Sequence, residues 1–288
     1  MNYHRPTSFA EAAELAASAS GVTRVLAGGT DVLVQMRADI VTPDTLIDIK
    51  AIDGVRDIRK ESDGSWTIGA AVAGAEMSEH DDLSAAWPGV VEAMDLIGST
   101  QVQGRATLVG NLCNASPAAD SVPAIVAAGA SVSITGPDGN RRAAVVDIPA
   151  APGKTTLKPG ELITAVHLPP AVPGQGDAYL RFIPRTEMDI AVVGCGVWLR
   201  LEGDTVADAR VALGAVAPTV LLVQACADAL IGSRLDDAAL GRLATAASDA
   251  CSPITDKRGT IAFRTQVAGV MARRAAETAY ARAKGDKA

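Results

Sequence analysis

The sequence has few aromatic residues, histidines and cysteines. Phe, Trp and Tyr make up 3% of its 288 residues, and there are three histidines and four cysteines. The cysteines form no C-x-x-C pair, which argues against a four-thiolate iron–sulfur cluster in this chain and indicates reduced thiols in a cytoplasmic protein. The histidines lie far apart, so the sequence does not support a zinc site. These residues are Cys113, Cys195, Cys226, Cys251, His4, His80 and His167.

The sequence also has no excess of basic charge and no long apolar run. There are 33 acidic and 26 basic side chains, which gives a formal net charge of −7. Because no cluster of Lys and Arg is interleaved with aromatics, we expect no nucleic-acid partner. No run of about 18 apolar residues occurs, which predicts that no segment spans a membrane. The first six residues lack the apolar stretch of a signal peptide, so we expect a cytoplasmic location.

The remaining composition is that of a folded globular protein. Hydrophobic residues make up 48% of the chain and charged residues 20%, and the length suffices for one large domain or two ordinary ones. Ser8 and Glu11 form a capping-box pattern that starts the first predicted helix. Residues 169–176 are rich in Pro and Gly, which interrupts regular pairing and predicts a domain boundary. We expect a mixed α+β fold with a larger N-terminal and a smaller C-terminal part.

Periodicity and turn residues divide the chain into elements. Helices are predicted at residues 9–19, 32–38, 85–97, 121–128, 220–231, 237–250 and 260–283. Strands are predicted at residues 22–27, 46–49, 66–70, 132–134, around 145, and at 162–168, 190–201 and 205–216. Residues 101–114 and 150–160 are expected to be loops.

A Gly-Gly pair follows the first predicted strand. Gly28 and Gly29 have no Cβ, so a ligand can approach the backbone closely. The amides of residues 28–31 converge at the start of a helix, which suits a pyrophosphate. The segment lacks the spacing of a dinucleotide fingerprint or a P-loop. A tight strand-to-helix turn capped by Thr30 or Asp31 explains the same residues equally well.

Residues 107–120 form a second unusual segment. Small residues alternate there with hydrogen-bonding side chains and show neither helical nor strand periodicity. An irregular stretch of this length inside a globular domain is typical of a functional loop. Asp120, close to a predicted helix start, can accept hydrogen bonds from a ribose or can simply stabilise the helix dipole.

These segments carry a resemblance to a known family. Residues 27–33 (AGGTDVL) resemble A-G-G-T-D-L-L, and residues 107–120 resemble T-I-G-G-N-I-x-x-A-S-P-x-x-D. Residues 185–191 (RTEMDIA) resemble a third signature, R-x-x-x-D-I-A. All three occur in this order in the FAD-binding medium subunits of molybdenum hydroxylases of the xanthine dehydrogenase and carbon monoxide dehydrogenase type. The resemblance covers essentially the whole chain.

The resemblance implies a fold and a domain division. Residues 1–172 would form a two-subdomain FAD-binding domain of the PCMH/VAO type. Residues 177–284 would form a smaller α+β domain of the CO dehydrogenase flavoprotein C-terminal type.

The resemblance also implies a cofactor site. The first signature would wrap the FAD pyrophosphate with its backbone amides and the Thr30 hydroxyl, and the second would line the other side of the cofactor. Asp120 would bind a hydroxyl of the ribose or ribityl chain, Ile163 would contact the adenine side, and Ile190 would lie against the isoalloxazine ring. Neither flavin signature has a His placed for a covalent bond, so non-covalent FAD is expected. The full set is Val25, Leu26, Ala27, Gly28, Gly29, Thr30, Asp31, Val32, Thr107, Gly110, Asn111, Cys113, Asp120, Ile163, Arg181 and Ile190.

Two residues depart from the family pattern. Val109 stands where the second signature has Gly, and because Val disfavours φ > 0, a more extended backbone is expected there. Arg181 stands where several relatives carry a Lys near the ring. An Arg is always charged and planar, so we expect it to stabilise negative charge on the reduced flavin and to affect which oxidant approaches.

The implied function is that of an electron-transfer subunit. A large partner subunit would hold the molybdenum cofactor and a small one two [2Fe-2S] clusters, with a dimer of heterotrimers as a possible assembly. FAD on this chain would receive the electrons and pass them to NAD, a quinone or oxygen. Two alternatives stay open: a stand-alone flavin-dependent oxidoreductase of the same fold, and a flavin-free assembly subunit.

Overall fold

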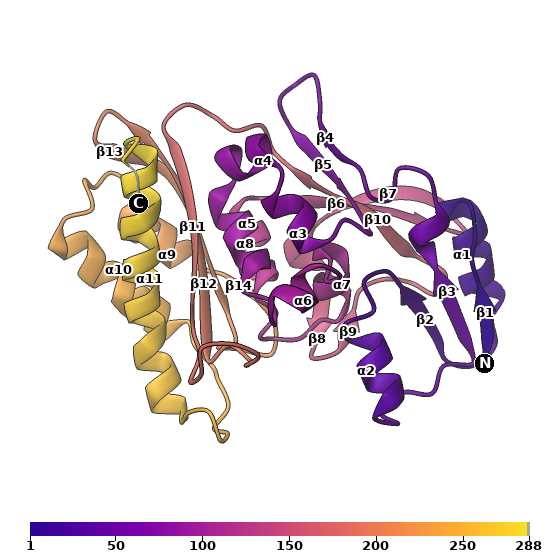
Figure 1. Ribbon diagram of the computed structural model, residues 1–288. Helices are drawn as coiled ribbons and strands as arrows, with labels where there is room; N and C mark the ends of the chain where they lie inside the picture. The colour runs from indigo at the N-terminus through magenta and orange to yellow at the C-terminus, as the bar shows by residue number, and fades with distance from the viewer. Residues whose placement is uncertain (287–288) are drawn as a thin grey trace.

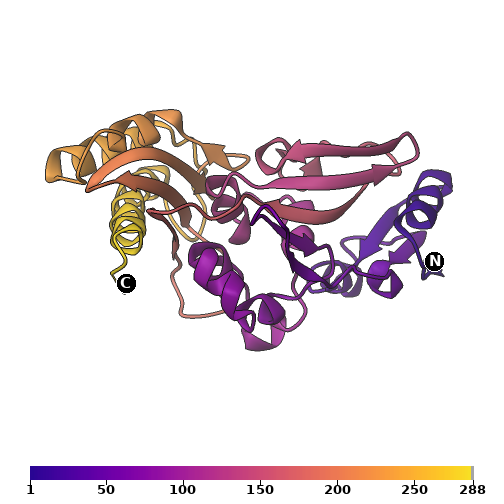
Figure 2. The ribbon, with the colours of Figure 1, turned by 90° about the horizontal axis from the view of Figure 1, so that it is seen from above.

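The computed structural model describes residues 1–286 and arranges them around three main sheets that follow one another along the molecule, with a further two-stranded sheet (Figures 1 and 2). The first sheet is parallel, with the order β1-β3-β2. Its strands are β1 (Asn2–His4), β2 (Thr23–Leu26) and β3 (Thr45–Asp48). Helix α1 (Phe9–Ser18) follows β1 and helix α2 (Val32–Arg37) follows β2. As predicted, Ser8 caps α1, because its Oγ accepts a hydrogen bond from the Glu11 amide at 3.2 Å.

The second sheet is antiparallel and has five strands in the order β4-β5-β10-β6-β7. They are β4 (Ile58–Lys60), β5 (Trp66–Gly69), β6 (Ser131–Gly136), β7 (Gly139–Ala144) and β10 (Leu162–Leu168). Six helices separate β5 from β6: α3 (Gly74–Ser78), α4 (Asp81–Ala86), α5 (Pro88–Asp95), α6 (Thr100–Gln103), α7 (Leu108–Cys113) and α8 (Ser121–Ala127). The short elements η1 (Ile49–Ala51), η2 (Val145–Asp147), β8 (Pro149–Ala151) and β9 (Lys154–Thr155) complete this part.

The third sheet is antiparallel in the order β11-β12-β13-β14. Its strands are β11 (Gln175–Phe182), β12 (Val193–Glu202), β13 (Thr205–Gly214) and β14 (Leu221–Leu222). Helices α9 (Gln224–Leu230), α10 (Asp237–Asp249) and α11 (Ile261–Ala283) cover its outer face, whereas α5 and α8 pack on the inner face (Figure 1). Both faces of this sheet are therefore buried.

Two hydrophobic cores result, and the third sheet contributes to both. One core lies between its outer face and the C-terminal helices. The other fills the N-terminal part and extends to Tyr179 and Trp198 on the inner face. Arg210 of β13 also links the two parts: its Nε donates to the carbonyl of Ala127 at the end of α8 at 2.7 Å, and its guanidinium stacks over Trp198.

Several sequence-based expectations about elements are wrong. Residues 101–114 are helical in α6 and α7 because Thr107 caps α7 and the apolar residues of α7 are buried, a pattern that Gly110 and Asn111 obscure. The predicted helix 85–97 is broken at Trp87, and Pro88 starts α5. Strand β11 was not predicted, because it is covered on both faces and shows no alternation.

Other differences are smaller. Strands β1, β4 and β14 were not predicted, and a small hairpin, β8–β9, lies in the expected loop 150–160.

None of the helices described for residues 1–286 combines the length and apolar character needed to cross a bilayer. The same 286 residues contain no group of three His, Cys, Asp or Glu side chains arranged to ligate a metal ion.

Candidate functional site

The first candidate segment is the turn between β2 and α2. None of the backbone amides of residues 28–31 donates to a backbone carbonyl within the described part of the chain. The Asp31 side chain makes no capping hydrogen bond to α2, so the alternative in which Asp31 caps this helix is wrong. Four successive amides are thus left available to an acceptor from outside the backbone, as a bound phosphate would be.

The two glycines of this turn are required by the chain's own packing. A Cβ on Gly28 would lie 1.9 Å from the carbonyl oxygen of Arg105. Gly29 has φ +80°, a left-handed conformation that side chains rarely adopt, and a Cβ there would lie 3.0 Å from Leu26 and Leu33. The pair therefore brings the turn against the chain that leads into the second segment.

The second segment is held by two side-chain hydrogen bonds. The buried Thr107 hydroxyl accepts from the Gly110 amide at 2.9 Å and caps α7. Asn111 Oδ1 accepts from the Ser121 hydroxyl at 2.7 Å and so links α7 to α8. Val109 lies in the helix with its side chain buried, so the expected extended backbone is wrong: a helical φ suits Val as well as Gly.

The fold brings the two segments together. Besides the contact of Gly28 with Arg105, the Gln35 side chain of α2 donates to Asn114 Oδ1 after α7 at 3.3 Å. The amides of residues 28–31 and the start of α7 therefore belong to one region, although about 80 residues separate them in the chain.

A buried ionic cluster adjoins the second segment. The Asp120 carboxylate accepts from Tyr179 Oη at 2.9 Å and from Arg181 Nη1 at 2.7 Å, and both partners come from β11. Burial raises the pKa of Asp120 to about 6, although the Arg181 guanidinium and the Tyr179 hydroxyl favour the ionised form. Burial also raises the pKa of Tyr179. Asp120 makes no capping bond to α8, so the alternative in which it serves only that helix is not supported by its contacts.

Arg181 lacks one of the partners that a buried guanidinium needs. Its side chain is 5% exposed, and its Nε is buried without a hydrogen-bond partner within residues 1–286. A buried donor without a partner destabilises the fold by about 1–3 kcal/mol. An acceptor that binds beside Arg181 and pairs with its Nε would therefore be bound favourably. This orphaned donor fits a polar cofactor in the same region.

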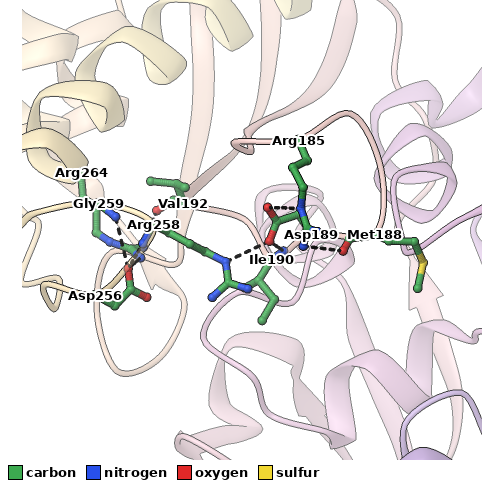
Figure 3. A network of polar contacts seen from close by, with 9 residues as sticks. All are labelled: Arg185, Met188, Asp189, Ile190, Val192, Asp256, Arg258, Gly259 and Arg264. Atoms are coloured by element: carbon green, nitrogen blue, oxygen red, sulfur yellow. Dashed lines mark hydrogen bonds and ion pairs between the residues drawn. The ribbon is translucent and has the colours of Figure 1, made fainter.

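The third segment is the loop between β11 and β12 (Figure 3). The Asp189 carboxylate lies between Arg258 Nε at 2.9 Å and Arg185 Nε at 3.2 Å. The hydrogen bond from Arg258 is the main reason that the pKa of Asp189 is lowered to about 2. The neighbouring Ile190 is 51% exposed, which leaves its side chain available for a contact. The amide of Met188 donates to the Gly98 carbonyl at 3.3 Å, so the loop reaches the N-terminal part.

The other predicted site residues lie in different environments, some exposed and some in the core. Val25 is exposed on the edge strand β2, whereas the side chains of Leu26 and Ile163 lie in the core. Ile163 pairs with Ile134 in the second sheet, so the structure does not bring its side chain to an open surface. Cys113 is partly buried, and burial raises the pKa of its thiol to about 12, which keeps it neutral.

Comparison with known proteins identifies the family. A family model described as the FAD binding domain in molybdopterin dehydrogenase matches residues 1–171, and one described as the CO dehydrogenase flavoprotein C-terminal domain matches residues 178–279. The chain belongs to the family of molybdopterin dehydrogenase FAD-binding subunits. Membership of this family confirms the prediction, made from three short signatures, of an FAD-binding oxidoreductase subunit with an α+β fold.

Individual members of this FAD-binding family match over nearly their full length. The carbon monoxide dehydrogenase medium chain of Afipia carboxidovorans is 35% identical over 284 residues, 99% of this chain and 98% of that one. The xanthine dehydrogenase FAD-binding subunit of Escherichia coli O157:H7 is 29% identical over 99% of this chain and 97% of its own. A crystal structure of the cyanide-inactivated Cu,Mo-CO dehydrogenase superposes with a TM-score of 0.93, at 34% identity and 98% coverage of both chains.

Sequence reasoning missed three residues that complete this site: Tyr179, Arg105 and Arg258. Tyr179 and Arg181 are two apart and point to the same face of β11, a signal that appears once that strand is recognised. Arg105 contributes its backbone carbonyl, which lies against Gly28. Arg258 contacts Asp189, which is 69 residues away in the chain. The sequence contains no local signal for either contact.

Proposed function

We propose that this chain is the electron-transferring FAD subunit of a heteromeric molybdenum hydroxylase. It receives electrons from the [2Fe-2S] clusters of a small partner subunit and delivers them to an external acceptor, which is NAD, a quinone or oxygen. A large partner subunit holds the molybdenum cofactor and hydroxylates the substrate. The names of the matched relatives, a medium chain and an FAD-binding subunit, support a role within a multi-subunit enzyme. A dimer of such heterotrimers in the cytoplasm is the assembly we expect.

One observation carries this proposal: the turn at residues 28–31, with its free backbone amides, lies against the chain entering α7. Bound FAD would supply redox chemistry in both one-electron and two-electron steps, which suits transfer from one-electron clusters to an external acceptor. The amides of residues 28–31 and the Thr30 hydroxyl bind its pyrophosphate, and Thr107, Gly110 and Asn111 shape the opposite wall. We assign residues 1–172 to the FAD-binding domain and residues 177–284 to the C-terminal domain.

The remaining residues orient the cofactor and adjust its surroundings. Asp120 binds a hydroxyl of the ribityl or ribose chain, and Arg181 brings positive charge and its unpaired Nε. A fixed cation in a site from which water is excluded stabilises negative charge more strongly than it would in water. Ile190 contacts the ring and Ile163 the adenine side. Binding is non-covalent.

The cofactor assignment is tested by the visible spectrum of the chain purified with its partner subunits. We expect flavin absorption and release of FAD on denaturation with acid. A complex that lacks flavin and takes up none when FAD is added would show instead that this chain is a flavin-free assembly subunit.

The electron-transfer assignment needs a second experiment, rapid reduction of the whole complex by its substrate. In complex depleted of FAD, the [2Fe-2S] clusters should still be reduced, but reduction of the external acceptor should stop and should return when FAD is restored. Turnover of a small substrate by the isolated chain would favour a stand-alone oxidoreductase and contradict the proposal.

A further inference from the structure

The Asp189 carboxylate fixes the backbone of the loop between β11 and β12. Asp189 Oδ1 accepts from the amide of Ile190 at 2.8 Å and also from Arg258 Nε at 2.9 Å. The same oxygen therefore connects a distant arginine to the peptide group that carries Ile190 (Figure 3). Its side chain is 5% exposed, so these donors act largely shielded from water, where charge-assisted hydrogen bonds are strong.

Arg258 is itself held in place by the C-terminal domain. It lies in a tight turn in which Asp256 and Gly259 exchange backbone hydrogen bonds, and Asp256 Oδ1 accepts from the Arg258 amide at 2.8 Å. The same Asp256 oxygen accepts from Arg264 Nη2 at 2.7 Å. Arg264 is buried on α11 and also donates to the carbonyl of Val192, the residue before β12. A continuous set of polar contacts thus runs from α11 through the turn to the loop (Figure 3).

The two arginines that contact Asp189 are not equivalent. Arg185 belongs to the same loop, four residues away, and its side chain is 69% exposed. Such a local pair on the surface contributes little and does not fix the loop relative to the rest of the molecule. Arg258 is 19% exposed and comes from another element. Among the hydrogen bonds of residues 1–286, the other one that ties residues 183–191 to a distant element runs from the Met188 amide to the Gly98 carbonyl.

We propose that Arg258 is a positioning residue that holds the loop of residues 183–191, and with it Ile190, in place at the flavin site. The role at the flavin rests on the proposed function, whereas the anchoring of the loop does not. Loss of the Arg258 guanidinium frees Asp189 to turn toward solvent and releases the peptide group of Ile190 from its fixed orientation. The loop then samples open conformations and exposes the ring.

Hydrogen–deuterium exchange of residues 186–191 in the full chain, within its complex, tests the anchoring. The variants are Arg258→Gln and Arg258→Lys, with two controls. Arg185→Gln removes the local partner of Asp189, and Arg141→Gln removes an arginine paired with Glu161 at 2.7 Å on the second sheet. We expect exchange to be about tenfold faster in Arg258→Gln, intermediate in Arg258→Lys, and close to wild type in both controls. Unchanged exchange in Arg258→Gln, or an equal increase in Arg185→Gln, would overturn the proposal.

A flavin measurement separates this inference from the proposed function. In the FAD-loaded complex we expect iodide to quench flavin fluorescence severalfold more strongly in Arg258→Gln, while the dissociation constant of FAD changes by less than about threefold, because the pyrophosphate contacts lie elsewhere. Faster exchange with unaltered quenching would refute the placement of this loop at the ring. A wild-type complex that binds no FAD would refute the proposed function and leave the exchange result valid.

Discussion

Gly28 packs against the carbonyl oxygen of Arg105, so that a Cβ on residue 28 would lie only 1.9 Å from that oxygen. This contact joins the turn after β2 to the chain that enters α7. The contact places the turn beside the residues that precede the second signature segment, and it involves only backbone atoms. The geometry of the proposed pyrophosphate site therefore depends on the absence of a side chain at one position.

Replacing Gly28 by Ala should separate the two segments and weaken FAD binding. The new methyl group must displace the Arg105 peptide, and overpacking of this kind costs about 1–3 kcal/mol. We expect FAD affinity, measured by fluorescence titration, to fall at least about tenfold. The matched control is Gly241→Ala on α10, where a Cβ has no neighbour within 4 Å; it should leave FAD affinity unchanged and raise stability by about 0.5–1 kcal/mol. Equal effects of the two substitutions would contradict the assignment.

Thr107→Ala should destabilise the start of α7. The substitution removes the hydroxyl that accepts from the Gly110 amide at 2.9 Å, and loss of such a cap costs about 1 kcal/mol. Urea denaturation should show this loss, and FAD affinity should fall with it because α7 forms one wall of the proposed site. Thr107→Ser keeps the hydroxyl and should behave as wild type. A Ser variant as weak as the Ala variant would mean that the buried methyl group matters and the cap does not.

Arg181→Met should lower the stability of the fold more at high pH than at low pH. It leaves the buried Asp120 with Tyr179 as its partner, and breaking a buried ion pair costs about 3–5 kcal/mol when the remaining charge persists. Burial already raises the pKa of Asp120 to about 6, and loss of Arg181 raises it further. The carboxyl of the variant is therefore neutral at pH 5. At pH 8 it is either ionised without a charged partner or held protonated although it would ionise in the unfolded chain, and both states lower the free energy of unfolding.

Urea denaturation of Arg181→Met at these two pH values checks this expectation. The double variant Asp120→Asn/Arg181→Met should remove most of the pH dependence that the single variant adds, because neither position then carries an ionisable group. A destabilisation that is the same at pH 5 and pH 8 in the single variant would show that packing, and not charge, is lost.

Asp177 should make the protein less stable as the pH rises. Its carboxylate is buried at the start of α5, where it accepts from the Val90 amide at 3.1 Å, and burial raises its pKa to about 7. The pKa in the unfolded chain is about 3.9, so the folded state binds the proton more tightly. This contribution to stability is complete below about pH 4 and is lost as the pH rises to about 7.

The variant Asp177→Asn keeps an acceptor for Val90 and has no ionisable group. It should be more stable than wild type at pH 8, by up to about 4 kcal/mol, and the difference should shrink toward pH 4. Thermal or urea unfolding across this range provides the test. Parallel stability curves for the two proteins would show that Asp177 does not titrate in this window.

The sequence predicted well those elements that depend on residues close together in the chain. The cap of α1 by Ser8 and the long C-terminal helices depend on neighbouring residues and were predicted close to their observed positions. Strand β11 was missed because both of its faces are covered, so its residues do not alternate between polar and apolar. Helix α7 was missed because Gly110 and Asn111 have low helix propensity, which the buried residues of α7 outweigh.

The sequence by itself determined the family and the segments that carry the site, because residues 27–33, 107–120 and 185–191 each form a signature within one short stretch of chain. The tertiary structure alone decided which groups meet: Gly28 with Arg105, Asp120 with Arg181, and Asp189 with Arg258. These pairs are 61 to 77 residues apart. Contacts across such distances follow from how the sheets and helices pack, and packing is a property of the whole chain that no local pattern encodes.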